Sequence, residues 1–122
     1  MLNRTELKAW TDALRSGDYI QGHEKLKQIN QDGSCSHCCL GVLCEIEGVP
    51  QEKFGYFFKF GKSSTYLPDN LACKFGDEEG MFDLIGMPFL RGFNSVAQAN
   101  DAGVSFSEIA DHLDKYYPAI EG

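Results

Sequence analysis

Apolar residues near the start of the chain recur at the spacing of an amphipathic helix. Three large side chains fall on one helical face: Leu7, Trp10 and Leu14. Because residues three or four positions apart lie on the same side of a helix, this face is expected to be buried. Asn3 followed by Glu6 matches a capping box, in which each side chain bonds the other residue's backbone N–H. We predict a helix that begins at this cap and ends at Gly17.

The last quarter of the chain carries two more helix patterns. Residues 95–102 are predicted to form a helix that ends at Gly103. Ser105 and Glu108 then match a second capping box. Apolar residues recur at helical spacing from there toward Tyr117: Phe106, Ile109, Ala110 and Leu113. These positions predict a C-terminal helix with one buried face.

Aromatic residues in the middle of the chain alternate with other residues, which is the pattern of a half-buried strand. Four of them are expected to face the core: Phe54, Tyr56, Phe58 and Phe60. Phe57 then points to the other face, with Lys59 in the same set. Residues 61–64 can turn the chain into a second short strand through Tyr66, which completes a β-hairpin. The outward Phe57 is either a binding surface or is covered by a helix or a second subunit, which would make the protein a homodimer.

The segment before the hairpin carries a polar stretch and a strongly apolar one. In residues 18–37, Leu26 and Ile29 can mark a short helix within otherwise polar sequence. An apolar helix is expected to start near Cys38 and to end at Gly48, with a proline just beyond. This second helix looks central to the core.

The segment after the hairpin completes the fold. A short helix is predicted to open at Pro68 and to close at Gly76, followed by an acidic turn over 77–79 and a strand over 81–85. No linker or internal repeat divides the chain. We therefore predict a single domain, residues 1–122, of the α+β class: four to five helices packed on a small antiparallel sheet that contains the aromatic hairpin.

Composition and charge limit the classes of function. With 122 residues the chain can bury about two thirds of its unfolded surface, so it needs no metal or cross-link to hold a core. The net charge of −7 opposes phosphate binding, so no nucleic-acid partner is expected. No apolar run approaches the roughly 20 residues that span a bilayer, and no secretory signal is evident, so we expect a cytoplasmic protein without membrane contact. A basic protein or a small molecule is the expected kind of partner.

One segment resembles part of a DNA-binding motif. Residues 102–113 are similar to the glycine turn and entry helix of a helix-turn-helix. A DNA reader also needs a recognition helix with basic or amide side chains, and none follows before Pro118. The expectation of no nucleic-acid partner therefore stands.

Four cysteines lie within ten residues, and a fifth, Cys73, stands alone. Cys35 and Cys38 have the spacing of one zinc knuckle, but tetrahedral zinc usually needs a second close pair. Cys44 lies within the predicted helix, and the three histidines add no short-spaced pair. We therefore predict neither a bound metal nor another cofactor.

The same cysteines allow a catalytic alternative. Cys38 or Cys39 at a helix N-terminus could be a nucleophile, because unpaired N–H groups favour a thiolate, and Gln21 could donate to an oxyanion. A general base is the weak point, since His37 is adjacent in sequence and His112 lies on the far helix. The competing interpretation is a buried helix face, in which cysteine packs as a small hydrophobe. Mid-helix Gly41 fits the second view, because it suggests that another backbone passes close by.

Four blocks of sequence resemble a known group of proteins. They are Ala13-Leu14-Arg15-Ser16-Gly17, Tyr19 with Gln21-Gly22, the run from Cys38 to Cys44, and Asn100-Asp101 with Gly103, Ser105-Phe106 and Ile109-Ala110-Asp111. In this order they are similar to short, mostly uncharacterised phage and prophage proteins with an "LRSG.Y.QG … CCLGVLC … ND.G.SF..IAD" pattern. The resemblance implies a small phage-encoded protein that acts in the cytoplasm of a bacterial host cell. It carries no established activity.

Together these features favour a non-catalytic binder. We expect an accessory protein that inhibits or sequesters a host component, a defence factor among the candidates, or that binds a small ligand. The matching polar residues are the expected binding residues beside Phe57: Gln21, Asn100 and Asp101. They either satisfy backbone groups at turns or, if they converge with Cys38, line a pocket.

Overall fold

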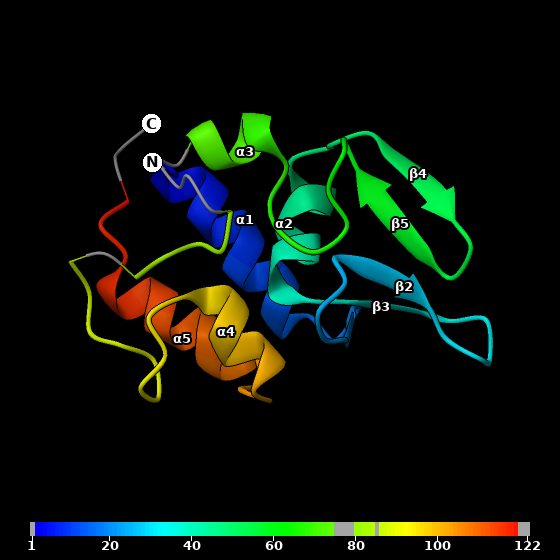
Figure 1. Cartoon of the computed structure of the whole chain (residues 1–122). Coiled ribbons are helices and arrows are strands. Elements are labelled where there is room, and N and C mark those ends of the chain that lie inside the picture. The colour runs from blue at the N-terminus through cyan, green and yellow to red at the C-terminus, as the bar shows by residue number, and fades with distance from the viewer. Residues whose placement is uncertain (1, 75–79, 85, 120–122) are drawn as a thin grey trace.

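A group of helices lies beside a small sheet whose outer hairpin extends away from the helices (Figure 1). The computed structural model describes residues 2–74, 80–84 and 86–119. Within these residues the helices are α1 (Arg4–Arg15), α2 (Cys39–Ile46), α3 (Asp69–Lys74), α4 (Val96–Asp101) and α5 (Phe106–Tyr116). The strands are β1 (Ile20–Gln21), β2 (Lys27–Ile29), β3 (Cys35–His37), β4 (Gln51–Phe54) and β5 (Phe57–Phe60). This arrangement confirms the predicted α+β class.

The predicted N-terminal caps of α1 and α5 are present, whereas α2 has Cys38 at its N-cap position without a side-chain cap. Asn3 and Glu6 form the complete capping box of α1. Ser95 caps α4 by accepting from the backbone N–H of Gln98. Ser105 accepts from the backbone N–H of Glu108 at the start of α5, but the Glu108 carboxylate pairs with Arg91 instead of closing the box. The local signals for these helices were therefore sufficient to find their N-termini.

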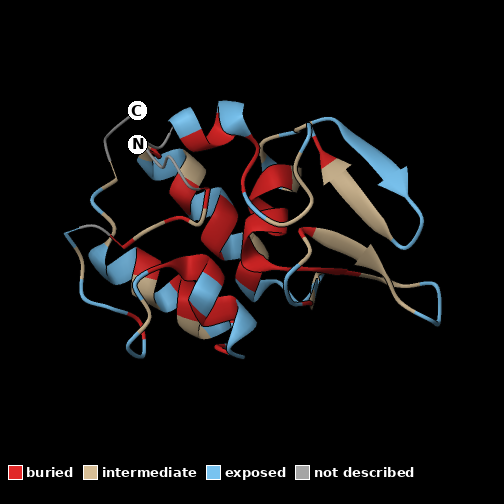
Figure 2. Cartoon of the chain, viewed as in Figure 1, coloured by how far each residue is buried: buried red, intermediate tan, exposed pale blue. Residues whose placement is uncertain are grey.

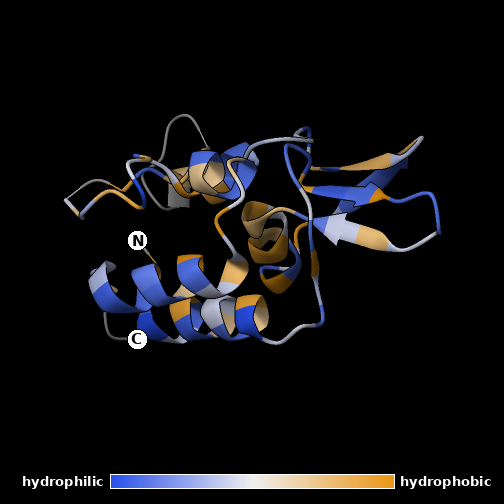
Figure 3. Cartoon of the chain, turned by 90° about the horizontal axis from the view of Figure 1, so that it is seen from below, coloured by the Kyte–Doolittle hydropathy of each residue, from blue (hydrophilic) through white to orange (hydrophobic). Residues whose placement is uncertain are grey.

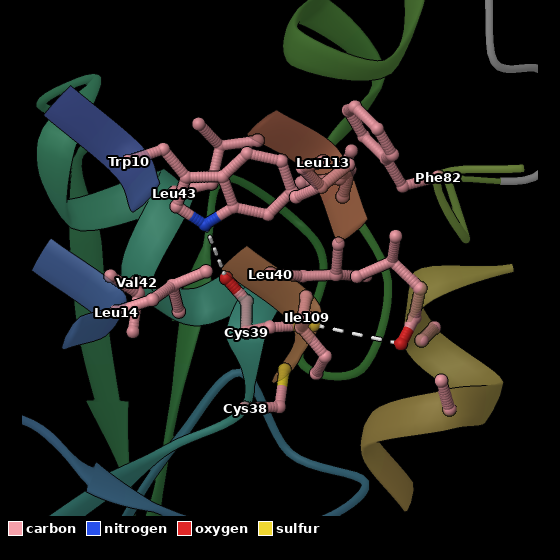
Figure 4. Close-up of a cluster of buried hydrophobic side chains, with 14 of the residues drawn as sticks. Trp10, Leu14, Cys38, Cys39, Leu40, Val42, Leu43, Phe82, Ile109 and Leu113 are labelled. Atoms are coloured by element: carbon pink, nitrogen blue, oxygen red, sulfur yellow. Dashed lines mark hydrogen bonds between the residues drawn. The ribbon is translucent and has the colours of Figure 1, made fainter. Parts of the chain in front are cut away.

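Helix α2 is the centre of the core. Its residues from Cys39 to Cys44 are all buried (Figure 2). It is the most apolar helix, while the hairpin strands mix hydrophobic and hydrophilic positions (Figure 3). Trp10 of α1 lies against it and donates from Nε1 to the carbonyl oxygen of Cys39 at 2.9 Å (Figure 4). The buried indole thus has the polar partner that it needs.

Gly41 explains how β2 can approach this helix. A Cβ at this position would overlap the carbonyl oxygen of Leu26, which is backbone and cannot rotate away. The prediction that another backbone passes close to Gly41 is confirmed. Glycine destabilises a helix interior, and the close approach of the segment before β2 explains why a glycine is nevertheless present at this position.

The sheet has the order β1-β3-β2-β5-β4, and only the β1–β3 pair is parallel. Residues 18–37 therefore hold three short strands, so the short helix predicted around Leu26 and Ile29 is wrong. Lys27 pairs with His37 and Ile29 with Cys35, so these four side chains share one face of the sheet. The pairing with distant partners outweighs the weak helical spacing.

The hairpin is present, but its turn lies elsewhere. Phe54 pairs with Phe57, so the hairpin turns at Gly55 and Tyr56. The predicted turn within 61–64 is also present, as an isolated bridge between Phe60 and Ser63, but no second strand follows it through Tyr66. Gly55 has a φ of +64°, which suits the first position of a two-residue hairpin turn. The expected strand from Phe54 to Phe60 is thus two strands.

One later expectation differs as well, and another is tested only in part. Within 81–84 the structure has an isolated bridge from Asp83 to Ser95 in place of the predicted strand, and Ile85 lies outside the described residues. The short helix after Pro68 is present as α3, whereas its expected end at Gly76 and the acidic turn over 77–79 also lie outside them. No helix in the described parts of the chain combines the length and apolarity that crossing a bilayer requires.

Candidate functional site

Asn100 is completely buried between α2, α4 and the loop after β1. Its Oδ1 accepts from the backbone N–H of Cys39 and from Nε2 of Gln21, each at 3.1 Å. Its Nδ2 donates to the carbonyl oxygen of Gly22 at 2.9 Å and to Asp101 Oδ1 at 3.3 Å. A primary amide has two donor and two acceptor sites, and all four are used here. Asn100 therefore caps the first turn of α2 from a different helix.

Gln21 caps the N-terminus of α5 in the same way. Its Nε2 also donates to the carbonyl oxygen of Val104 at 2.7 Å, and its Oε1 accepts from the backbone N–H of Phe106 at 3.2 Å. Phe106 is the first residue of α5, whose N–H has no partner within the helix. The amide of Gln21 thus joins β1 to the start of the C-terminal helix.

Asp101 completes this polar cluster, which we call the capping cluster: Gln21, Asn100 and Asp101. Its Oδ1 accepts from the backbone N–H of Glu24 at 2.8 Å, and His23 Nδ1 lies 3.0 Å from the carbonyl oxygen of Asn100. The three residues do converge beside Cys38 and Cys39. The side-chain amides of Gln21 and Asn100 form their hydrogen bonds within the protein. Of the three residues, only the exposed Asp101 lines a cavity.

The two cysteines beside the cluster are buried. Cys38 is the residue before α2 and makes no side-chain cap, and burial raises its pKa to about 12. Burial likewise holds the pKa of Cys39 well above its ordinary value, and its Sγ lies 3.7 Å from the carbonyl oxygen of Val96 (Figure 4). Both shifts oppose thiolate formation, because a charge is costly in apolar surroundings. The pair is better suited to packing than to nucleophilic attack.

The remaining cysteines do not gather around a metal. Cys35 is half-buried on β3, Cys44 is buried in α2 and Cys73 is exposed on α3. In the described part of the chain, no three side chains of His, Cys, Asp or Glu come together as metal ligands.

Buried His37 and half-buried Glu45 form a second polar contact, on the face of the sheet toward α2. His37 Nε2 lies 3.0 Å from Glu45 Oε2, while its Nδ1 has no hydrogen-bond partner among the described residues. Burial lowers the pKa of His37, and the nearby Glu45 only partly compensates. Burial alone would raise the pKa of Glu45, but hydrogen bonds from His37 and Gln51 and the charge of Lys27 outweigh it and lower the pKa. Because Lys27, His37 and Gln51 all contact Glu45, this side chain links β2, β3 and β4 to α2.

The hairpin carries aromatic rings on its other face. The register places Phe54, Phe57 and Lys59 on one side and Phe58 and Phe60 on the other. Only Phe60 is fully buried. The prediction that Phe57 and Lys59 point away from Phe58 is confirmed.

Two other aromatic residues of the hairpin differ from the prediction. Phe54 is 40% exposed and Tyr56 is 61% exposed, so neither faces the core as expected. The physical reason is the turn at Gly55, which pairs Phe54 across the hairpin with the outward Phe57 and leaves Tyr56 at the tip.

The outward rings form what we call the hairpin face: Phe54, Tyr56, Phe57, Lys25 and Lys59. The Phe54 and Phe57 rings stack at 6.4 Å, and Tyr56 meets Phe57 edge-on at 5.5 Å. Lys25 Nζ lies 4.5 Å from the centre of the Phe57 ring, and Lys59 Nζ lies 4.6 Å from that of Phe54. Each ammonium therefore covers a ring within cation–π range.

An open groove runs between α4 and the segment from Met81 to Asn94, and sequence reasoning missed it. Two adjoining cavities of about 600 and 500 Å³ share four lining residues: Met81, Phe89, Asn94 and Gln98. Tyr66 and Asp101 line the first cavity, and Asp83 lines the second. The available signal in the sequence was the presence of aromatic residues in an otherwise irregular segment. Phe89 is one of them, and the structure leaves it 61% exposed.

These contacts define a class of protein: a small α+β domain whose buried and half-buried polar residues cap its own helices and whose exposed aromatic residues lie on a hairpin and in a groove. Residues 2–73 match the model of the family described as Domain of unknown function (DUF8296). Because the match spans more than half of the 122 residues, the chain belongs to this family. No curated protein and no solved structure matches the chain.

Proposed function

We propose that the chain is a small phage-type accessory protein that binds a host protein in the bacterial cytoplasm and acts without catalysis. Inhibition or sequestration of the host component, with a defence factor among the candidates, is the proposed outcome of binding. The phage origin rests on the four sequence blocks described above. The hairpin face is the observation that carries the proposal.

Exposed aromatic rings are unusual enough on this face to need an explanation. Tyr56 is 61% exposed and Phe54 is 40% exposed, and both contact Phe57. Large rigid rings supply binding area at low entropic cost and are enriched at the centres of protein interfaces. The hairpin extends away from the helices (Figure 1), which leaves room for a partner on this face.

Local charge indicates what kind of surface the partner presents. On the hairpin side of the sheet, Lys25 and Lys59 outnumber Glu52, which lies opposite Lys59, although the whole chain has a net charge of −7. Lys25 and Lys59 lie over the outward rings. A partner with carboxylates around an apolar centre complements both features. The local charge thus reverses the expectation of a basic partner drawn from the overall charge.

A second copy of the chain fits the neighbouring sheet edge poorly. β4 is an edge strand, and all its residues are exposed. Antiparallel pairing of two β4 strands about a two-fold axis places a residue opposite its own copy. The two registers with most overlap therefore set Glu52 against Glu52 or Lys53 against Lys53, and like charges directly opposite destabilise a sheet. A different protein is favoured over a homodimer through this edge.

Buried thiols support a non-catalytic role. The raised pKa values of Cys38 and Cys39 predict slow labelling by iodoacetamide in the native protein at neutral pH. The exposed Cys73 is the internal control and should be labelled first, as mass spectrometry of the digested protein would show. Fast labelling of Cys38 or Cys39 in the folded state would instead support the thiol enzyme.

The binding proposal is tested by capture from bacterial lysate with the tagged protein and two matched variants. Tyr56→Ser removes a ring from the hairpin face, and Phe89→Ser removes a ring of equal 61% exposure elsewhere. We expect a stoichiometric protein with the wild type and with Phe89→Ser, and at least about tenfold less with Tyr56→Ser, as for a central interface residue.

Three results would contradict this proposal. They are the absence of any stoichiometric protein, equal recovery by Tyr56→Ser, and equal loss with Phe89→Ser. Light scattering on the purified protein measures its oligomeric state and so tests the alternative of self-association. A dimer that Tyr56→Ser converts to a monomer would assign the hairpin face to a second copy instead.

A further inference from the structure

The groove beside α4 is a second surface whose chemistry the proposed function does not use. Its two cavities meet at Met81, Phe89, Asn94 and Gln98, so they form one continuous depression. A combined space of this size is ample for a small organic ligand. None of the hairpin-face residues lines either cavity.

The charge of the groove has a single sign. Asp101 lines one cavity and Asp83 lines the other, with the shared residues between them. Among the described residues that line these cavities, none is basic. Asp101 is also held in place, because its Oδ1 accepts from the backbone N–H of Glu24 and from Asn100 Nδ2. A carboxylate fixed in this way is pre-organised to receive a cation.

The walls of the groove suit an aliphatic chain with cationic ends. Tyr66, Phe89 and Phe93 contribute rings, and Met81 contributes a flexible apolar side chain. Aromatic faces attract ammonium groups as well as methylene groups. The exposed side-chain amides of Asn94 and Gln98 bond to no described residue, so their oxygens can accept from an ammonium N–H.

We propose that this groove binds a linear aliphatic diamine or polyamine. One ammonium group pairs with Asp101 and a second with Asp83, and the methylene chain crosses Met81 and Phe89. Because the two carboxylates line different cavities that share Met81 and Phe89, a ligand with two cations is favoured over one with a single cation. A neutral chain of equal length would forgo both ion pairs, and an anion would meet only negative charge.

Calorimetric titration with a series of α,ω-diamines from three to eight carbons tests the length requirement. Binding is expected to reach a maximum at one chain length, since only one spacing satisfies both carboxylates. The α,ω-diol of the same length is the neutral control and should not bind. Equal affinity at every length would indicate a general counter-ion effect and overturn the proposal, as would the absence of binding at millimolar diamine.

Variants locate the site on the groove. Asp101→Asn keeps an oxygen for the Glu24 N–H and should weaken the best diamine by about tenfold or more, because it removes a charged partner. Asp83→Asn and Phe89→Ser should each weaken it too, and Phe89 is exposed enough to be replaced without unfolding the protein. Asp12→Asn removes a carboxylate on α1 that pairs with Lys8, and it should leave the affinity unchanged.

Equal loss with Asp12→Asn, or full affinity in all three groove variants, would overturn the site. Capture of the host protein provides an independent comparison. Phe89→Ser should lose diamine and keep the host protein, whereas Tyr56→Ser should do the reverse. Failure of one site therefore leaves the other open to its own test.

Discussion

The helical body and the aromatic hairpin use similar side chains in opposite ways. In the body, Trp10 is buried with its Nε1 bonded, and Asn100 is buried with all four hydrogen-bonding positions used. On the hairpin, Tyr56 and Phe54 are exposed, and their contacts are with neighbouring rings and lysines. Figure 2 shows the same division between a buried centre and an exposed β4.

This difference separates structural polar residues from surface suited to binding. A buried amide whose groups are all paired stabilises the fold, because removing it leaves several backbone groups without partners. An exposed ring contributes little to the stability of the monomer, and it can bury more apolar surface by contacting another molecule. Gln21 and Asn100 therefore stabilise the fold, whereas the hairpin residues are the ones on which the proposed function depends.

The largest effect is expected at Gly41. Gly41→Ala should lower the free energy of unfolding by about 3 kcal/mol or more, because its Cβ meets the backbone carbonyl of Leu26. Urea denaturation measures the change. Ser107→Ala on the exposed side of α5 is the control, with a change of less than about 0.5 kcal/mol. A tolerated alanine at Gly41 would mean that β2 does not approach α2 as described.

Asn100 tests the capping cluster. Asn100→Ala should cost about 2 to 3 kcal/mol, because the N–H of Cys39 and the carbonyl of Gly22 lose their partner in the core. Asn94→Ala removes an exposed amide of the same kind and should change stability by less than about 0.5 kcal/mol. Similar values for the two variants would remove the distinction between cluster and surface.

A smaller effect should appear with pH at His37. Its folded-state pKa lies below the ordinary 6.5, so the unfolded chain binds the proton more tightly. The resulting stability is complete above pH 6.5 and is lost as the pH falls from there through the folded-state value. The groups that face this ring are Glu45 of α2, Lys27 of β2 and the ring of Tyr19.

Denaturation at a series of pH values tests this dependence. His37→Gln should flatten the fall in stability just below pH 6.5, whereas His112→Gln should retain it, because His112 lies at the surface of α5 with its ring near the carbonyl of Pro88. The carboxylate of Glu45 contributes in the same direction only at lower pH, since its pKa is lowered from 4.5. An unchanged profile in His37→Gln would assign the acid sensitivity to other groups.

The smallest change in stability is expected on the hairpin face. Phe57→Ser should shift the free energy of unfolding by less than about 1 kcal/mol while it abolishes partner binding, because Phe57 contacts other outward rings. Phe60→Ser on the opposite face is the matched control and should cost about 3 kcal/mol, since Phe60 is fully buried. Equal losses in both variants would place Phe57 in the core of the monomer.

Local sequence was enough to predict the helices and part of the hairpin. The Asn3–Glu6 box, the Ser95 and Ser105 caps and the apolar spacing of α1 and α5 act within one or two turns, so they can be read without the fold. The turn at Gly55 was readable in the same way, as a glycine-led pair between apolar residues, but the longer aromatic alternation concealed it.

The sequence by itself determined the α+β class, the helix caps, the buried α2 and the need for a glycine at position 41. Only the tertiary structure decided the strand pairing of residues 18–37, the use of Gln21 and Asn100 as caps and the groove beside α4. Gln21 and Asn100 are 79 residues apart, and each caps a helix to which it does not belong. Such contacts depend on how the elements pack, and one residue's neighbours in sequence carry no record of that packing.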